Sequence, residues 1–170
     1  MRLVPPGPGP KPDSIRQLHF VDIDNLTAGP TQDLRSHRIV RQWYDRCTNR
    51  GDMDLCFVAC SHHSGFAVAT VWEGARIYWR SGQDGADYAL LNALDEANFD
   101  GTNHVWVASG DGIFISRVKA VHANRTGGER IEVSVLALDE SSVNPGLARV
   151  ADNVTTIAGA HATNDLAAAS

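Results

Sequence analysis

HFVDIDNL, residues 19–26, is the stretch that decides the expected fold. Its apolar side chains lead directly into a group of polar ones, Asp22, Asp24 and Asn25, which is typical of a buried strand that ends in an acidic site. Ligands of open α/β sheets bind at the carboxyl ends of the strands, so these oxygen atoms are expected to face whatever binds. No glycine-rich turn follows, which argues against a dinucleotide site. Carboxylate oxygens instead favour a hard divalent metal ion.

Strand-like and helix-like segments alternate along the rest of the chain. Strands are expected at residues 54–61, 75–80, 104–109, 131–138 and, briefly, 154–158, and helices at residues 31–49, 85–97, 113–125 and from 144 onward. Thr31 is the expected cap of the first helix, and Gly127 with Gly128 the expected end of the third. The alternation predicts a three-layer α/β, Rossmann-like fold with a central, mainly parallel sheet of about five or six strands and helices on both faces.

Proline, glycine and alanine content predicts the domain boundaries. Residues 1–16 read as a flexible Pro/Gly-rich lead-in and residues 159–170 as a flexible Ala-rich tail. A single domain is expected between them, over residues 17–158.

Composition limits the compartment and the partners. The chain has 170 residues, of which 43% are hydrophobic and 21% charged, as is usual for a soluble domain. Three cysteines are too few and too odd in number for a disulfide framework, so a reducing cytoplasm is expected. The longest apolar run, residues 66–72, is too short to span a bilayer, so no membrane partner is expected. The net charge of −5 disfavours a nucleic-acid partner, unless clustered carboxylates bind divalent ions and invert the local charge.

Two further aspartates stand where such a site would need them. Asp87 projects into the apolar arc of the helix at 85–97, where an unpaired carboxylate is costly without a cation or hydrogen-bond donors. A favourable interaction with the helix dipole is the alternative explanation. Asp111 stands between two glycines at a strand-to-helix turn, where an ordinary Asp-Gly turn is the alternative.

Three segments together resemble the NYN domain family, a branch of the PIN-like metal-dependent nucleases. They are VDIDNL at 21–26, DGADYALLNAL at 84–94 and VASGDGIF at 107–114. Each motif alone is weak, but they stand in family order and at family-like intervals, so that the resemblance covers residues 18–151. It implies a compact Rossmann-like fold, Mg²⁺ or Mn²⁺ as the cofactor, and RNA as the usual substrate.

The resemblance also implies roles for single residues. Asp22 matches the first-strand aspartate of the family, and Asn25 matches the asparagine three positions later. Asp87 matches the acid that opens the middle helix. Ser109 and Asp111 match the serine and the aspartate of the SGD turn after the fourth strand.

The chain departs from the family pattern at two positions. Many members carry a further aspartate six residues along the middle helix and another two residues after the SGD acid, where this chain has Ala93 and Ile113. Asp24 and Asp84 are the residues that could replace part of the missing carboxylate set.

The expected activity is hydrolysis of RNA phosphodiester bonds by metal-activated water. The candidate catalytic residues and metal ligands are Asp22, Asp87 and Asp111, with Asp24 and Asp84 as secondary metal ligands and Asn25 and Ser109 in supporting positions. Weaker candidates for contact with nucleic acid, each more simply explained as surface charge, are Arg80, Arg117, Lys119, Arg35 and Arg38.

Two other functions remain open. A catalytically weakened domain that binds RNA or a protein would keep the fold and part of the acid set, because fold alone does not establish activity. A haloacid dehalogenase-like phosphohydrolase is suggested by the DxD pattern of Asp22 and Asp24, although Leu26 and the residues after Asp111 depart from that family. The sequence leaves the RNA substrate, a homo-oligomer and a protein partner undecided.

Overall fold

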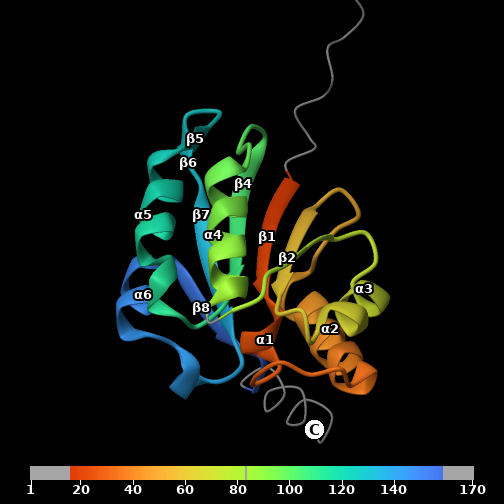
Figure 1. Cartoon of the computed structure of the whole chain (residues 1–170). Helices are drawn as coiled ribbons and strands as arrows, with labels where there is room; N and C mark the ends of the chain where they lie inside the picture. Colours follow the sequence, from red (N-terminus) through yellow and green to blue (C-terminus); the bar gives the residue numbers. More distant parts are fainter. Residues whose placement is uncertain (1–15, 83, 159–170) are drawn as a thin grey trace, which may run out of the picture.

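The computed structural model describes residues 16–82 and 84–158, so the expected tail and nearly all of the expected lead-in lie outside the described residues. A six-stranded sheet with the strand order β3-β2-β1-β4-β7-β8 forms the centre of the fold (Figure 1). Each neighbouring pair of strands in this sheet is parallel, so the carboxyl ends of the strands meet at one edge. The strands are β1 (Arg16–Asp22), β2 (Leu55–Cys60), β3 (Arg76–Trp79), β4 (Thr102–Ala108), β7 (Glu132–Ala137) and β8 (Asn153–Thr156).

Helices cover both faces of this sheet and complete the three layers (Figure 1). One face carries α4 (Gly85–Glu96), α5 (Ile115–Ala123) and α6 (Pro145–Val150), and the other carries α2 (Leu34–Thr48) and α3 (Gly65–Val71). The predicted fold class, a three-layer Rossmann-like α/β domain, is therefore confirmed. None of the described helices combines the length and the apolar character needed to cross a membrane.

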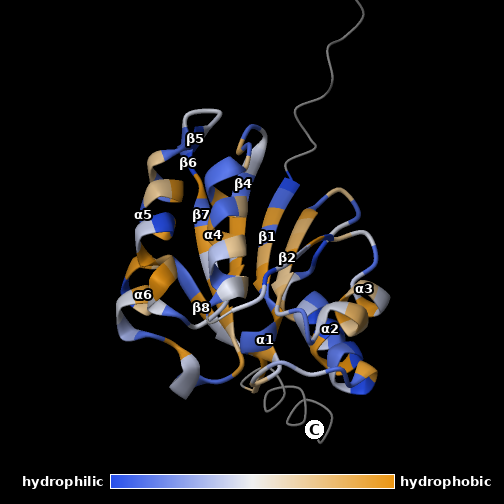
Figure 2. Cartoon of the chain, viewed as in Figure 1, coloured by the Kyte–Doolittle hydropathy of each residue, from blue (hydrophilic) through white to orange (hydrophobic). Residues whose placement is uncertain are grey.

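The strands read as nearly continuous apolar runs because both faces of the sheet are buried. In β1, Leu18 and Phe20 pack toward α4, whereas Val21 packs toward α2 and α3. In β2, Phe57 and Val58 divide between the same two clusters. Figure 2 shows the result, with hydrophobic residues following the strands and hydrophilic ones gathered on the outer sides of the helices and in the loops.

The strand order places a topological switch point between β1 and β4. The chain leaves β1 toward β2 and β3 on one side, and leaves β4 toward β7 and β8 on the other. Helices that connect these strands therefore lie on opposite faces, and a crevice opens at the carboxyl ends of β1 and β4.

Strand β1 ends at Asp22, the first residue of the acidic group. A one-turn helix, α1 (Ile23–Leu26), follows, and Asp22 caps it by accepting a hydrogen bond from the backbone N–H of Asn25 at 3.2 Å. Asp24 and Asn25 therefore lie on a helical turn beyond the strand.

Several local predictions need correction. The cap of α2 is Asp33, which accepts hydrogen bonds from the two backbone N–H groups that follow Leu34, whereas the Thr31 hydroxyl accepts one from the backbone N–H of Asp33. Residues 65–71, expected only as a short apolar segment, form a helix. Strand β1 begins at Arg16, one residue before the expected domain boundary.

The region after the fourth strand also differs from the prediction. It begins with a single 3-10 turn, η1 (Gly112–Phe114), and α5 ends at Ala123. Strands β5 (Arg125–Thr126) and β6 (Glu129–Arg130) then pair antiparallel. Gly127 and Gly128 have φ angles of 59° and 90°, so they form the turn of this hairpin and do not end the helix.

Candidate functional site: an acidic pocket at the switch point

A pocket of about 200 Å³ lies at the carboxyl edge of the sheet, beside the start of α4. Segments that follow β1, β3 and β4 reach it because the parallel topology brings those strand ends to one edge. Its lining contains every acid that the sequence singled out, together with Asn25: Asp22, Asp24, Asp84, Asp87 and Asp111. The structure thus brings all five carboxylates to one place, and their role as ligands stays a prediction.

Asp22 and Asp87 form the buried part of this acidic pocket. Asp22 is only 5% exposed and Asp87 is half-buried. Burial raises the pKa of Asp22 well above its usual value, and the neighbouring Asp87 carboxylate raises it further. Burial also raises the pKa of Asp87. Of the described residues, none forms a hydrogen bond with the buried Oδ1 atom of Asp87. The pair therefore needs a proton or a cation to offset its charge.

Asp24 has a defined structural task in the pocket wall. Its Oδ2 atom accepts a hydrogen bond from the backbone N–H of Ser61 at 2.7 Å, and its Oδ1 atom accepts one from the hydroxyl of Ser64 at 2.6 Å. Asp24 thereby joins the turn after β1 to the turn after β2. Both of its oxygens are engaged, which leaves it less free than Asp22 or Asp87 to bind a ligand.

The predicted SGD turn is held from two sides. The side-chain oxygen of Asn25 accepts a hydrogen bond from the backbone N–H of Gly110 at 3.2 Å. The buried Ser109 hydroxyl accepts one from the backbone N–H of Asp111 at 3.2 Å. The Oδ1 atom of Asp111 accepts one from the backbone N–H of Ile113 at 2.9 Å and so caps η1. Asn25 and Ser109 therefore position the turn that carries Asp111.

Glycine is the one residue type that fits at position 110 of this turn. A Cβ atom there would lie 1.8 Å from the carbonyl oxygen of Ser142, in the short 3-10 helix η2 (Glu140–Ser142). The carbonyl oxygen of Gly110 also accepts a hydrogen bond from the backbone N–H of Asn144 at 2.8 Å. The glycine is thus required by close backbone packing.

Asp84 and Asp111 form the exposed part of the pocket. Asp84 precedes α4 with a φ angle of 55°, and its side chain makes no capping hydrogen bond. Gly85 follows in close contact with the preceding loop, because a Cβ atom there would lie 2.5 Å from the carbonyl oxygen of Arg80. The exposed carboxylates of Asp84 and Asp111 therefore border the part of the pocket that is open to solvent.

The basic candidates lie elsewhere. Arg80 is exposed, with its guanidinium 5.7 Å from the centroid of the Tyr88 ring. Arg117 forms an ion pair with Asp95 at 2.7 Å. The remaining three are exposed on helices, and none of the five basic candidates is among the described residues that line the acidic pocket: Lys119 on α5, and Arg35 and Arg38 on α2.

Sequence reasoning missed part of the lining. Ser61 and Pro30 contribute to the pocket, and Gly82 reaches it from the loop after β3. Ser61 had a detectable signal, since it is the last residue of a predicted strand whose carboxyl end lies at the same edge. Pro30 had none, because its position depends on the path of the loop before α2.

Apolar side chains occupy the two positions where the resemblance leads one to expect more acids. Ala93 is buried on α4, and Ile113 is partly buried on η1 against the same hydrophobic cluster. Neither is among the residues that line the acidic pocket. The carboxylate set thus consists of the five aspartates already named.

Over residues 16–82 and 84–158, no three His, Cys, Asp or Glu side chains already lie close enough together to hold a metal ion. Comparison of the chain with protein-family models finds no match, and comparison with curated proteins finds none either.

Proposed function

We propose that the acidic pocket binds a divalent cation, Mg²⁺ or Mn²⁺, and that the protein uses it to hydrolyse phosphodiester bonds in RNA. The observation that supports this best is the buried pairing of Asp22 with Asp87, in which the Oδ1 atom of Asp87 has no hydrogen-bond partner among the described residues. Two carboxylates in such a place are costly unless a cation or a proton offsets their charge.

The residues present suit a hard cation. Such ions take oxygen ligands from carboxylates, and three carboxylates that line the pocket, those of Asp22, Asp87 and Asp111, would hold one. Asp84 lines the open side of the pocket and would assist, whereas Asp24 is engaged with two serines. A bound ion would lower the pKa of a coordinated water and stabilise negative charge on the phosphate oxygens.

The protein's own groups orient this site and control access to it. Asn25 and Ser109 hold the turn that carries Asp111, while Asp24 fixes the opposite wall. The exposed carboxylates of Asp84 and Asp111 repel a phosphate when the pocket is empty of cations. We therefore expect RNA to enter the pocket only together with divalent ions.

The proposal is tested by incubating a mixed pool of single-stranded and structured RNA with the protein in Mg²⁺, in Mn²⁺ and in EDTA. Cleavage is expected with either metal and not in EDTA. Asp22→Asn should lose it, whereas Asp52→Asn, an equal change of charge on an exposed residue near the opposite edge of the sheet, should keep it. If Asp22→Asn cleaved at the wild-type rate, the assignment of Asp22 would be wrong.

A non-catalytic RNA-binding domain is the second candidate. It is favoured by Asp24, whose oxygens are both engaged, and by the apolar residues Ala93 and Ile113 at positions where relatives of the resembled family carry acids. RNA binding that is unchanged by EDTA, with no cleavage in Mg²⁺ or Mn²⁺, would decide for this function.

A further inference from the structure

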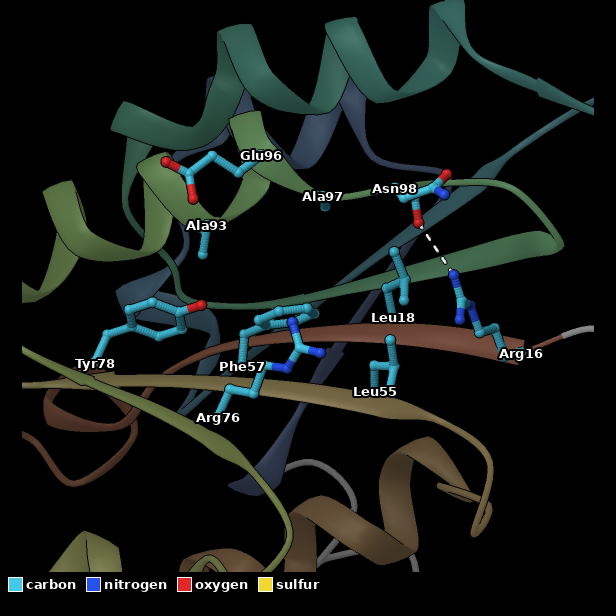
Figure 3. Close-up of a pocket in the computed structure, with 10 residues that line it drawn as sticks. All are labelled: Arg16, Leu18, Leu55, Phe57, Arg76, Tyr78, Ala93, Glu96, Ala97 and Asn98. Atoms are coloured by element: carbon cyan, nitrogen blue, oxygen red, sulfur yellow. Dashed lines mark hydrogen bonds between the residues drawn. The ribbon is translucent and has the colours of Figure 1, made fainter.

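A second feature of the surface lies outside the acidic pocket. A hollow of about 310 Å³ opens where α4 passes over β1, β2 and β3, and Figure 3 shows the side chains that line it. A neighbouring hollow of about 440 Å³ continues along β3. The two share Tyr78, Ala93 and Glu96, so they form one groove between β3 and α4, called the α4 groove below.

The groove exists because small side chains on α4 face an edge strand. Ala93 lies opposite Tyr78 across the hollow in Figure 3, and Ala89 and Ala97 line its two parts. β3 is the outermost strand on this side of the sheet, and only part of its length is covered. The alanines thus leave room beside Tyr78 that larger residues would fill.

Arginines follow the groove from one end to the other. Arg16 lies at its far end, where its Nη2 atom donates to the carbonyl oxygen of Asn98 at 3.3 Å. The exposed Arg76 lies midway, with its guanidinium 5.5 Å from the centroid of the Phe57 ring. Arg80 stands at the near end. Glu96 is the one acidic residue among those that line the groove in the described chain.

Arg76 and Arg80 differ from the arginines of this protein that form ion pairs. Four others form ion pairs with aspartates: Arg41, Arg50, Arg117 and Arg130. Within the part of the chain that the structure describes, no carboxylate forms an ion pair with Arg76 or Arg80. Each instead lies over an aromatic ring with its charge open to solvent. These two guanidinium groups are therefore available to a negatively charged ligand.

The near end of the groove leads to the acidic pocket. Arg80 lines the groove, and Gly82, two residues later, lines the pocket. The carbonyl oxygen of Arg80 also packs against Gly85, which belongs to the pocket lining. A chain bound along the groove would therefore reach the carboxylates directly.

We propose that the α4 groove binds single-stranded RNA and directs it to the acidic pocket, an inference that rests on the function proposed above. Arginines contact the phosphates, and exposed aromatic side chains offer faces on which bases stack. Trp79, which is 62% exposed, and the partly buried Tyr78 line the groove and supply these faces. The bases of a duplex are already stacked and paired, so this combination selects a single strand.

The test measures the affinity of a fluorescent single-stranded oligoribonucleotide in EDTA, where cleavage does not interfere. The double variant Arg76→Ala/Arg80→Ala should raise the Kd by about tenfold or more, since it removes two phosphate contacts. Trp79→Ala should raise it by a similar factor through lost stacking. The matched control is Arg46→Ala/Arg149→Ala, which changes the net charge equally with exposed residues of α2 and α6 and should leave the Kd within about twofold.

Two results would overturn the groove. One is an unchanged Kd in the Arg76→Ala/Arg80→Ala variant, as expected if the groove binds a peptide. The other is equally tight binding of a blunt duplex of the same length. Because these arginines are exposed, each variant should unfold at the melting temperature of the wild-type protein. An unchanged melting temperature shows that a loss of affinity does not come from unfolding.

Cleavage separates this inference from the function on which it rests. In Mg²⁺, Asp111→Asn should lose cleavage and keep its affinity for the oligoribonucleotide in EDTA, whereas the double arginine variant should lose affinity and still cleave at saturating RNA. Absence of cleavage in wild type, with arginine-dependent binding preserved, would refute the nuclease and leave the groove standing. Cleavage by wild type, with a Kd and a cleavage rate at subsaturating RNA that are unchanged in the double arginine variant, would do the reverse.

Discussion

The side-chain oxygen of Asn25 accepts a hydrogen bond from the backbone N–H of Gly110 at 3.2 Å, and this contact joins the turn after β1 to the turn after β4. It spans the switch point at which the acidic pocket lies. Asn25 is therefore a positioning residue for Asp111. The contact gives a structural role to the asparagine that stands three residues after Asp22.

Asn25→Ala should lower the free energy of unfolding by about 1–3 kcal/mol, because the buried N–H of Gly110 loses its acceptor. Metal-dependent cleavage should fall through a lower kcat, since the turn that carries Asp111 loses one support. Urea unfolding and steady-state kinetics measure the two effects. A stable Asn25→Ala variant with wild-type kcat would show that the contact does not position the turn.

Gly110→Ala tests the close packing of the same turn. The added Cβ atom would lie 1.8 Å from the carbonyl oxygen of Ser142, so backbone must move, and we expect a loss of about 3 kcal/mol or more. In Gly51→Ala the nearest atom is a side-chain oxygen of Asp54 at 3.5 Å, and stability should change by less than about 0.5 kcal/mol. Chemical denaturation compares them. Equal stability of the two variants would contradict the close approach.

Asp22→Asn should stabilise the metal-free protein at neutral pH. Because the folded state raises the pKa of Asp22, the carboxyl group favours folding below its ordinary pKa, and this advantage is lost as the pH rises through the raised value. Removing the charge should therefore raise the free energy of unfolding at pH 7. The gain should vanish near pH 3. Urea unfolding in EDTA across this range measures it.

Asp33→Ala is a control for which the expected change in stability at pH 7 has the opposite sign. Hydrogen bonds from Ser36 and from the backbone of Arg35 lower the pKa of Asp33, so its contribution is present at neutral pH and is lost as the pH falls through the lowered value. Its removal should destabilise the protein at pH 7. A loss of stability at pH 7 in Asp22→Asn, like that in Asp33→Ala, would show that the Asp22 carboxylate is well accommodated without a cation.

Divalent cations should stabilise the wild-type protein. Binding to the folded state alone adds about 2.7 kcal/mol at a concentration one hundred times the Kd, so the melting temperature should rise with Mn²⁺ or Mg²⁺. Asp87→Asn should remove most of this shift, because the buried part of the site loses one of its two carboxylates. Asp52→Asn should leave the shift intact. An unshifted melting temperature in wild type at millimolar Mn²⁺ would argue against cation binding.

The sequence allowed the sheet and the acids of the pocket to be predicted for a shared physical reason. Strands buried on both faces appear as apolar runs, and parallel strands send their carboxyl ends to one edge. Asp22 and Asp111 follow two such runs, and Asp87 opens the helix that packs on them, so the topology alone brings the three together.

What escaped prediction depends on contacts between segments distant in sequence. The engagement of Asp24 by Ser61 and Ser64 could not be predicted, because hydrogen bonds between loops leave no local pattern. The α4 groove also has no local sequence pattern, since an alanine such as Ala93 in a helix is typical of a core residue. The paired glycines after α5 suit a helix end as well as a hairpin turn, and strand pairing decided between them.

The most direct test of the central claim is the single-turnover rate of RNA cleavage in Mg²⁺ for wild type, Asp87→Asn and Asp52→Asn. If the acidic pocket is a metal-dependent nuclease site, wild type and Asp52→Asn cleave at the same rate. Asp87→Asn is then slower by about 100-fold or more, because it lacks an oxygen that would stabilise the charges of the reaction. Wild-type cleavage by Asp87→Asn, or no cleavage by the wild-type protein, would contradict the account.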